Sequence, residues 1–336
     1  MVVCKRINKW GDITMGEIHL DKLILHYENT NKAEAKSPRT IEWYTTNLGN
    51  FTGFLKSKGG TGNLADLDVQ AVREYIVREQ NRGLSPYSVA GKVRTLKAFS
   101  SWLFREGYSA QNILAGFKVP KVPQLMVEPL RNDEIAKLIS SENQLTASGC
   151  RNVAMLLTFL DAGPRLEELC LLPLENAHIE EGYLKIMGKG KKERVVPFGS
   201  NTKKALWRYV IHFRPEVVSS SGDYLFLTLE GNPLSTNAVK LLFKRWGRRA
   251  GVPRVHAHLC RHTFATNFLL YNCGDVFRLQ LILGHTTLNM VSHYVHLASA
   301  QAMINGKIIS PIDQLGIKGI KKYNIDKSLR KTSFKH

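Results

Sequence analysis

The sequence predicts a mainly helical protein with one small β-hairpin, an α+β fold arranged in two domains. Three observations lead to this prediction. Capping residues followed by apolar residues at helical spacing recur along the chain. Residues 177–198 alternate polar and apolar side chains about a Gly-Lys-Gly turn, as the strands of a hairpin do. The proline- and lysine-containing segment KVPKVPQ interrupts the helical pattern, so we expect a linker and a domain boundary near residue 120.

The N-terminal half begins with two well-marked helices. In SPRTIEWYTTNLGNFTGFLKSKG, Ser37 is the expected cap, Pro38 suits the first turn, and Gly59 and Gly60 end the helix. In DLDVQAVREYIVREQNRG, Asp68 is the expected cap and Gly83 ends the helix.

A third helix, in SPYSVAGKVRTLKAFSSWLFREG, repeats the Ser-Pro start. Its apolar residues form a stripe at helical spacing: Val89, Val93, Leu96 and Leu103. Arg94, Lys97 and Ser101 project from a different face. A weaker helix is expected around residues 17–29, and a short piece at 112–116 completes a small helical bundle.

The second half is longer and mixed. Helices are expected at residues 131–141, 151–163, 165–172, 201–213, 235–251, 259–272, 275–284 and 287–299, with the hairpin between the third and fourth.

Charge is the most informative bulk property. Lys and Arg number 47 against 28 Asp and Glu, a net charge of +19, which indicates a polyanionic partner such as nucleic acid. No apolar run is long enough to span a membrane, and the first residues lack a secretory signal, so we expect a soluble intracellular protein. The five cysteines are scattered without a C-x-x-C pair, which argues against a disulfide framework and a four-thiolate zinc site.

The stretch HLCRHTFATNFLLYN places two histidines and an arginine within about one helical turn. His258 and His262 have the i, i+4 spacing of a zinc-binding H-E-x-x-H helix, but Leu259 replaces the glutamate base and Arg261 would repel a cation. An anion fits better, because guanidinium matches phosphate oxygens and an imidazole can move a proton. A basic helix that merely touches a DNA backbone remains the alternative.

Three further motifs complete a set. AGPRLEELCLL carries Arg165 at the start of a helix with Glu168 three residues later, and MGKGKKERVVP places Lys189 at the hairpin tip. LGHTTLNMVSHYVHL places His285 before a helix and Tyr294 inside it. In order and spacing these motifs resemble the tyrosine recombinase (phage integrase) family, and the XerC/XerD-type enzymes most closely, over about residues 35–300.

The resemblance implies a reaction. Tyr294 would be the nucleophile that attacks the scissile phosphate and forms a 3′-phosphotyrosine, freeing a 5′-hydroxyl. Arg165 and Arg261 would clamp the non-bridging oxygens in the transition state. Lys189 would protonate the departing 5′-oxygen; Lys191 and Lys192 lie on the same turn, but the distance from Arg165 along the chain favours Lys189.

The remaining site residues follow from the same resemblance. His258 would be the base or proton shuttle near the tyrosine, His285 would support the phosphate by hydrogen bonding, and Glu168 would orient the cluster. No metal, ATP or other cofactor is implied, since the cations neutralise the phosphate. Two departures from the family pattern, Pro164 before Arg165 and Cys260 before Arg261, remove no reacting group.

The resemblance also implies an architecture: a SAM-like helical core-binding domain and a tyrosine recombinase catalytic domain that form a C-shaped clamp on double-stranded DNA. The expected segments are an extension at 1–33, the core-binding domain at 34–117, a linker at 118–127, the catalytic domain at 128–300 and a basic tail at 301–336. Candidate DNA contacts are Arg39, Thr40, Arg94, Lys97, Lys118 and Lys121.

Three functions are compatible with these residues. The first is site-specific recombination on a site with inverted arms, through a Holliday junction in a tetramer whose subunits the basic tail could link. It would serve a mobile element or chromosome dimer resolution, with an accessory directionality factor as a candidate partner, in the cytoplasm near the nucleoid. The alternatives are DNA relaxation of the topoisomerase IB type and a non-catalytic DNA-binding regulator.

Overall fold

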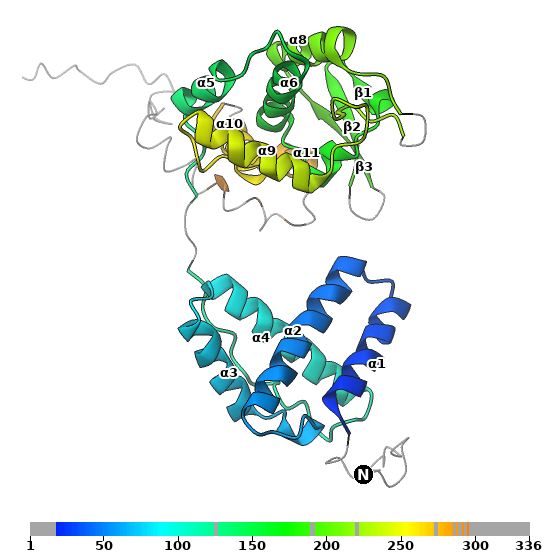
Figure 1. The fold of residues 1–336 in the computed structure, drawn as a ribbon, viewed down its shortest axis with the longest axis vertical. Coiled ribbons are helices and arrows are strands. Elements are labelled where there is room, and N and C mark those ends of the chain that lie inside the picture. The colour runs from blue at the N-terminus through cyan, green and yellow to red at the C-terminus, as the bar shows by residue number, and fades with distance from the viewer. Residues whose placement is uncertain are drawn as a thin grey trace, which may run out of the picture. The chain divides into compact units, whose positions relative to one another are not determined.

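A computed structural model describes residues 18–123, 127–188, 192–218, 222–271 and 275–284, together with residues 287, 291, 294 and 295. The chain divides into two compact units, residues 1–125 and 126–336 (Figure 1). We call them unit 1 and unit 2 and describe each separately.

Unit 1 is a helical bundle. Its elements are α1 (Leu20–Ala33), α2 (Pro38–Ser57), the 3-10 turn η2 (Leu64–Asp66), α3 (Val69–Asn81) and α4 (Pro86–Arg105). The three predicted caps are present, because the side chains of Ser37, Asp68 and Ser85 each accept a hydrogen bond from a backbone N–H in the first turn. Gly59 and Gly83 follow the ends of α2 and α3 with positive φ, as predicted.

Two expectations for unit 1 were inaccurate. The first helix begins at Leu20 and runs to Ala33, four residues beyond the expected end, because Tyr27 and Asn31 are buried on its inner face. Residues 113–116 form turns and not a helix. The core of the bundle is rich in aromatic rings, and Trp102 packs against both Phe99 and Tyr27.

Unit 2 combines helices with one sheet. Its helices are α5 (Asn132–Ser140), α6 (Ala147–Ala162), α7 (Leu166–Cys170), α8 (Ser200–Arg208), α9 (Thr236–Arg249), α10 (Ala257–Tyr271) and α11 (Val276–Leu283), with a 3-10 turn η3 (Leu174–Asn176) and a π-helical turn η4 (Tyr209–Phe213). The antiparallel sheet has the order β1 (Ala177–His178), β2 (Tyr183–Met187), β3 (Glu193–Pro197). The predicted hairpin is β2–β3, and the short strand β1 widens it to three strands.

Several predicted boundaries in unit 2 differ from the structure. Helix α6 begins at Ala147, earlier than expected, because Thr146 supplies its cap. Helix α7 has only five residues, and the expected helix at 201–213 ends in the π-helical turn η4. Of the expected helix at 287–299 most residues lie outside the described ones, but residues 291, 294 and 295 are helical.

Helix α6 is the centre of unit 2. It lies inside the unit with the sheet to one side, and most of its residues are buried (Figure 1). Helices α8 and α10 pack against it. Trp246 on α9 closes the core and donates its indole N–H to the Leu138 carbonyl at 3.0 Å. This packing fixes α10 and the end of α6 relative to each other, and both contribute to the site described below.

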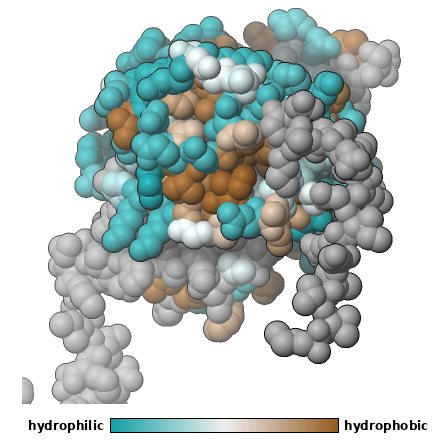
Figure 2. Space-filling model, turned by 90° about the horizontal axis from the view of Figure 1, so that it is seen from below, coloured by the Kyte–Doolittle hydropathy of each residue, from teal (hydrophilic) through white to brown (hydrophobic). Residues whose placement is uncertain are grey.

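The surface is not uniformly polar. Figure 2 shows a face on which hydrophobic residues gather within a rim of hydrophilic ones. Among the residues that the structure describes, no helix is both long and apolar enough to cross a membrane.

Candidate active site and DNA-contacting groove

A cavity of about 410 Å³ in unit 2 brings together residues that are far apart in the sequence. Four of the predicted catalytic residues line it: Arg165, His258, Arg261 and Tyr294. Pro164, Leu166, Lys240, His256 and Ala257 complete the lining. Lys189 and His285 lie outside the described residues.

Arg165 is positioned by the tight passage from α6 to α7. Gly163 ends α6 with φ +59°, and a Cβ at this position would lie 2.2 Å from Cδ1 of Phe264. Pro164 is buried and precedes Arg165, the cap residue of α7, so it belongs to this passage. The Arg165 backbone N–H and guanidinium each donate to the Glu168 carboxylate at 2.7 Å. The Arg165 side chain is still 39% exposed.

Arg261 is held inside the protein. It lies on α10, is 2% exposed, and donates to the carbonyls of Gly163 at 2.6 Å and Leu283 at 2.9 Å. Burial, followed by the charge of Arg165, lowers the pKa of Arg261 to about 10. The guanidinium therefore keeps its charge at neutral pH and faces the cavity as a fixed cation.

Two histidines at the start of α10 face the same cavity, and both are accessible to solvent in part. Desolvation lowers the pKa of His258, and the charges of Arg261 and then Arg165 lower it further. Desolvation and His258 likewise lower the pKa of His256. His256 accepts the Leu259 backbone N–H on Nδ1 at 3.2 Å, so its neutral form carries the proton on Nε2.

Tyr294 is the one described tyrosine that lines this cavity. It is 7% exposed, and burial raises the pKa of its phenol, while the charges of Arg261 and Arg165 act in the opposite direction. The His262 ring lies 5.2 Å from the tyrosine ring and donates Nε2–H to the Val127 carbonyl at 2.6 Å. His262 is therefore a buried residue that ties α10 to the segment before α5.

Glu168 has a partner that the sequence analysis missed. Arg194 on β3 binds both carboxylate oxygens, at 3.0 and 2.6 Å. Burial raises the pKa of Glu168, but the hydrogen bonds from Arg194 and the Arg165 backbone outweigh it, so the net pKa is lowered. The period of two along β3 was a usable signal, because it places Arg194 on the same face as the buried Val196.

Lys240 and His256 were also missed as lining residues. Lys240 lies on α9 outside any recognised motif, and His256 lies two residues before the HLCRH motif; the folded chain brings both to the cavity. Among the described residues, no group of three or more His, Cys, Asp or Glu side chains is arranged to hold a metal ion.

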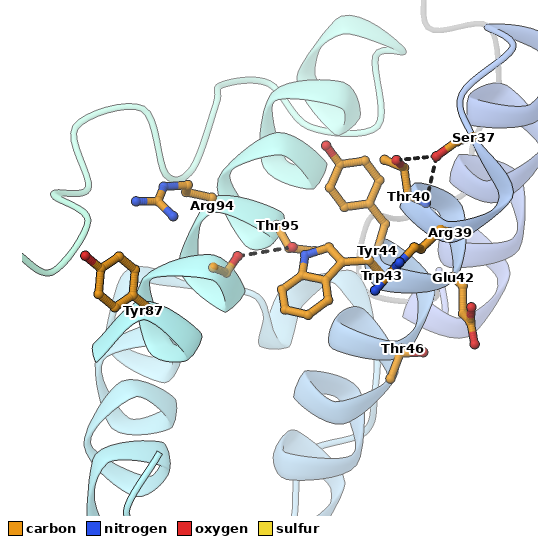
Figure 3. A pocket seen from close by; sticks show the side chains of 11 residues that line it. Ser37, Arg39, Thr40, Glu42, Trp43, Tyr44, Thr46, Tyr87, Arg94 and Thr95 are labelled. Atoms are coloured by element: carbon orange, nitrogen blue, oxygen red, sulfur yellow. Dashed lines mark hydrogen bonds between the residues drawn. The ribbon is translucent and has the colours of Figure 1, made fainter. Parts of the chain in front are cut away.

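Unit 1 carries a second concave site, a groove of about 770 Å³ between α2 and α4. Three of the predicted DNA contacts line it: Arg39, Thr40 and Arg94 (Figure 3). The Trp43 ring reaches from α2 toward α4 and is 49% exposed, and it approaches so closely that a Cβ on Gly91 would lie 3.1 Å from its Cζ2 (Figure 3).

The other three predicted DNA contacts lie elsewhere. The Lys97 ammonium donates to the backbone carbonyls of Ala115 and Phe117, so it fastens the segment after α4 and does not line the groove. Lys118 and Lys121 are exposed on the stretch that follows.

Comparison with known proteins agrees with these features. The model of the Phage integrase family matches residues 128–301, and that of the Phage integrase, N-terminal SAM-like domain matches residues 25–107. The chain is 30% identical over 262 residues to tyrosine recombinase XerC of Xanthomonas campestris pv. campestris (strain B100), which covers 78% of this chain and 79% of the relative. It is 31% identical over 284 residues to tyrosine recombinase XerC of Oceanobacillus iheyensis, which covers 83% of this chain and 92% of that relative.

A solved structure supports the same fold. The XerH site-specific recombinase, bound to palindromic difH substrate in a post-cleavage complex, superposes with a TM-score of 0.67 at 21% identity and covers 86% of this chain and 84% of that one. The mainly helical fold, the small sheet and the cavity with two arginines and a buried tyrosine define a DNA strand-transfer enzyme of the tyrosine type. The chain belongs to the phage integrase family of tyrosine recombinases, whose members are site-specific DNA recombinases. These findings support recombination and neither of the two alternatives.

Proposed function

We propose that the cavity of unit 2 binds the scissile phosphate and that Tyr294 attacks it. The observation that carries this proposal is the meeting of Arg165, Arg261 and Tyr294, from three separate elements, at one cavity. A phosphodiester that enters the cavity would meet two permanent cations, and each can donate to a non-bridging oxygen. Both arginines are held by protein acceptors beforehand, so little reorganisation is needed when charge develops.

The reaction keeps the free energy of the broken phosphodiester bond in a covalent bond to the protein. A bond forms between the Tyr294 oxygen and phosphorus while the bond from phosphorus to the 5′-oxygen breaks, which gives a 3′-phosphotyrosine and a 5′-hydroxyl. His258, neutral at pH 7, is proposed to take the phenol proton, and Lys189 to deliver one to the 5′-oxygen. Attack by a 5′-hydroxyl of the exchanging strand reverses the step, so no cofactor is required. His285 is proposed to hydrogen-bond the phosphate.

We propose that the groove of unit 1 faces DNA. Helices α2 and α4 both begin at this groove with a Ser-Pro cap, and helix N-termini attract phosphates. Arg39 and Arg94 add positive charge, while Trp43 offers an apolar surface to bases. Lys118 and Lys121 are proposed as backbone contacts beyond the groove.

Residues 34–117 and 128–300 are proposed as the core-binding and catalytic domains, with 118–127 as linker between them. We propose a tetramer on a site with inverted arms, in which the segment after residue 300 contacts a neighbouring subunit and strands exchange through a Holliday junction. A mobile element or chromosome dimer resolution would be served by the same core, with an accessory directionality factor as a candidate partner. Action on chromosomal DNA implies the cytoplasm as the place of work.

The first experiment tests whether the covalent protein–DNA intermediate forms. The full chain is incubated with a random duplex pool, bound sites are selected, and a nicked suicide duplex is built on the recovered site. With EDTA present, we expect an adduct on a denaturing gel, mapped to Tyr294 by peptide analysis.

The control is a matched pair of variants. Tyr294→Phe should bind the duplex with an affinity within about twofold of the wild type and form no adduct. Tyr271→Phe, which alters a tyrosine that is 76% exposed in the same unit, should form the adduct normally. Adduct-free cleavage that depends on a divalent metal would refute the proposal, as would an adduct on another residue.

A further inference from the structure

The end of α11 binds three arginines through three consecutive backbone carbonyls. The pairs are Ile282 with Arg194 Nε at 2.7 Å, Leu283 with Arg261 at 2.9 Å and Gly284 with Arg165 at 3.4 Å. The last carbonyls of a helix have no partner within it, and they form the negative end of its dipole. Gly284 closes the helix with φ +63° and turns the chain so that these carbonyls face the arginines.

Two of these three arginines are the proposed phosphate clamps, but Arg194 does not line the cavity. It lies behind them on β3, with a side chain that is 11% exposed. Its guanidinium joins two structures: Nε binds the end of α11, and the two Nη atoms bind both oxygens of Glu168. The same carboxylate holds the backbone and guanidinium of Arg165.

Charge explains why this third arginine matters. Glu168 is the one carboxylate bound to the cluster by the described hydrogen bonds, and its side chain is 8% exposed. Without Arg194, both carboxylate oxygens would be free to bind Arg165 in the bidentate geometry that guanidinium prefers, which would draw Arg165 away from the cavity. With Arg194 in place, three guanidiniums and one carboxylate leave two net positive charges, which suits a pentacoordinate phosphate that carries two negative charges.

We propose that Arg194 is a positioning residue for strand transfer. It occupies Glu168 and anchors the end of α11, so that Arg165 and Arg261 keep the spacing that the transition state requires, and it does not touch DNA. This inference rests on the proposed function, because it assigns Arg194 a role at the same cavity.

Arg214 provides a matched control. Its side chain is 10% exposed, its Nε donates to the Leu225 carbonyl at 3.2 Å, and an Nη atom binds the carboxylate of Asp223. It thus resembles Arg194 in burial and bonding, lies in the same unit, and takes no part in the lining of the cavity. The variants to compare are Arg194→Lys, Arg194→Ala and Arg214→Lys.

The measurements are the rate of adduct formation on the suicide duplex, the dissociation constant for the uncleaved duplex and the melting temperature. We expect Arg194→Lys to slow adduct formation about 10- to 100-fold, while duplex affinity stays within about twofold. Arg194→Ala should be slower still, so that lysine gives partial rescue. Arg214→Lys should lower the melting temperature by a similar amount as Arg194→Lys and leave the rate within about twofold.

Equal rates for Arg194→Lys and the wild type would overturn the inference. Equal slowing by Arg194→Lys and Arg214→Lys would also overturn it, because the effect would then be general destabilisation.

Hydrogen exchange of the free protein separates this inference from the proposed function. Arg194→Lys should increase exchange in peptides that cover residues 279–284, and Arg214→Lys should not. Unchanged exchange there would show that Arg194 does not anchor α11 and would overturn the inference even without DNA. A wild-type chain that forms no adduct on any selected site refutes the proposed function. The exchange result instead tests whether Arg194 anchors the end of α11, and it does not depend on the reaction.

Discussion

Replacing Gly163 by alanine tests how the active-site arginines are positioned. Gly163 lies between α6 and Arg165, and its carbonyl accepts a hydrogen bond from Arg261. Its φ is +59°, and an added Cβ would lie 2.2, 2.8 and 3.0 Å from three ring atoms of Phe264. The ring is buried, so it cannot move into solvent without exposing core surface.

The expected loss of stability has two parts. A left-handed conformation in a residue with a Cβ costs about 1–2 kcal/mol. Forcing a methyl group into the packed ring of Phe264 adds about 1–3 kcal/mol. Gly163→Ala should therefore lower the free energy of unfolding by about 2–5 kcal/mol, which for a unit of this size lowers the melting temperature by several degrees.

A variant at Gly251 separates the conformational cost from the packing cost. Its φ is +69°, but a Cβ there would meet no atom within 4 Å. Gly251→Ala should therefore show only the conformational part, about 1–2 kcal/mol. Both variants are compared with the wild type by urea denaturation and by the rate of adduct formation, and only Gly163→Ala should slow the reaction.

The reasoning is refuted if Gly163→Ala is no less stable than Gly251→Ala. It is also refuted if Gly163→Ala forms the adduct at the wild-type rate, because the shifted carbonyl would then have no effect on Arg261.

Three further outcomes are expected. The rate of adduct formation should decline with falling pH, with a midpoint below the ordinary histidine pKa of 6.5, because desolvation and two arginines lower the pKa of His258, which must be neutral to accept a proton. In unit 2, hydrogen bonds from Arg254 and other donors lower the pKa of Glu134 to about 2. The contribution of this carboxylate to stability is therefore complete above pH 4.5 and is lost as pH falls toward 2. Glu134→Gln should lower the free energy of unfolding at pH 7 by about 1–3 kcal/mol and remove this acid dependence. In unit 1, Arg94→Ala should weaken duplex binding about three- to tenfold at fixed salt, whereas Lys97→Ala should lower the melting temperature instead, because its ammonium binds backbone carbonyls.

Each outcome has a contrary result. A decline in rate whose midpoint lies at or above pH 6.5 would contradict the assignment of His258 as a base with a lowered pKa. Acid denaturation with the same midpoint in Glu134→Gln and the wild type would show that the ion pair contributes nothing in this pH range. A larger loss of duplex affinity in Lys97→Ala than in Arg94→Ala would reverse the roles given to these two cations.

The sequence by itself determined the helices with strong local signals. Ser37, Asp68 and Ser85 cap their helices because a short polar side chain satisfies an unpaired backbone N–H of the first turn, which depends only on neighbours in the chain. The motifs around Arg165 and Tyr294 were recognisable because their order and spacing along the chain resemble those of a known family. Helix ends set by burial, such as the extension of α1 to Ala33, were not recognisable.

The tertiary structure alone decided which charges meet. The alternation along β3 places Arg194 on the buried face, but only the folding of β3 against α7 and α11 shows that it binds Glu168 and Ile282. Lys97 shows the same dependence on the fold, because its helix face suggested only a DNA contact, whereas the fold brings two backbone carbonyls to its ammonium. Capping depends on residues a few positions apart, but the partner of a buried charge comes from whichever segment the core brings beside it.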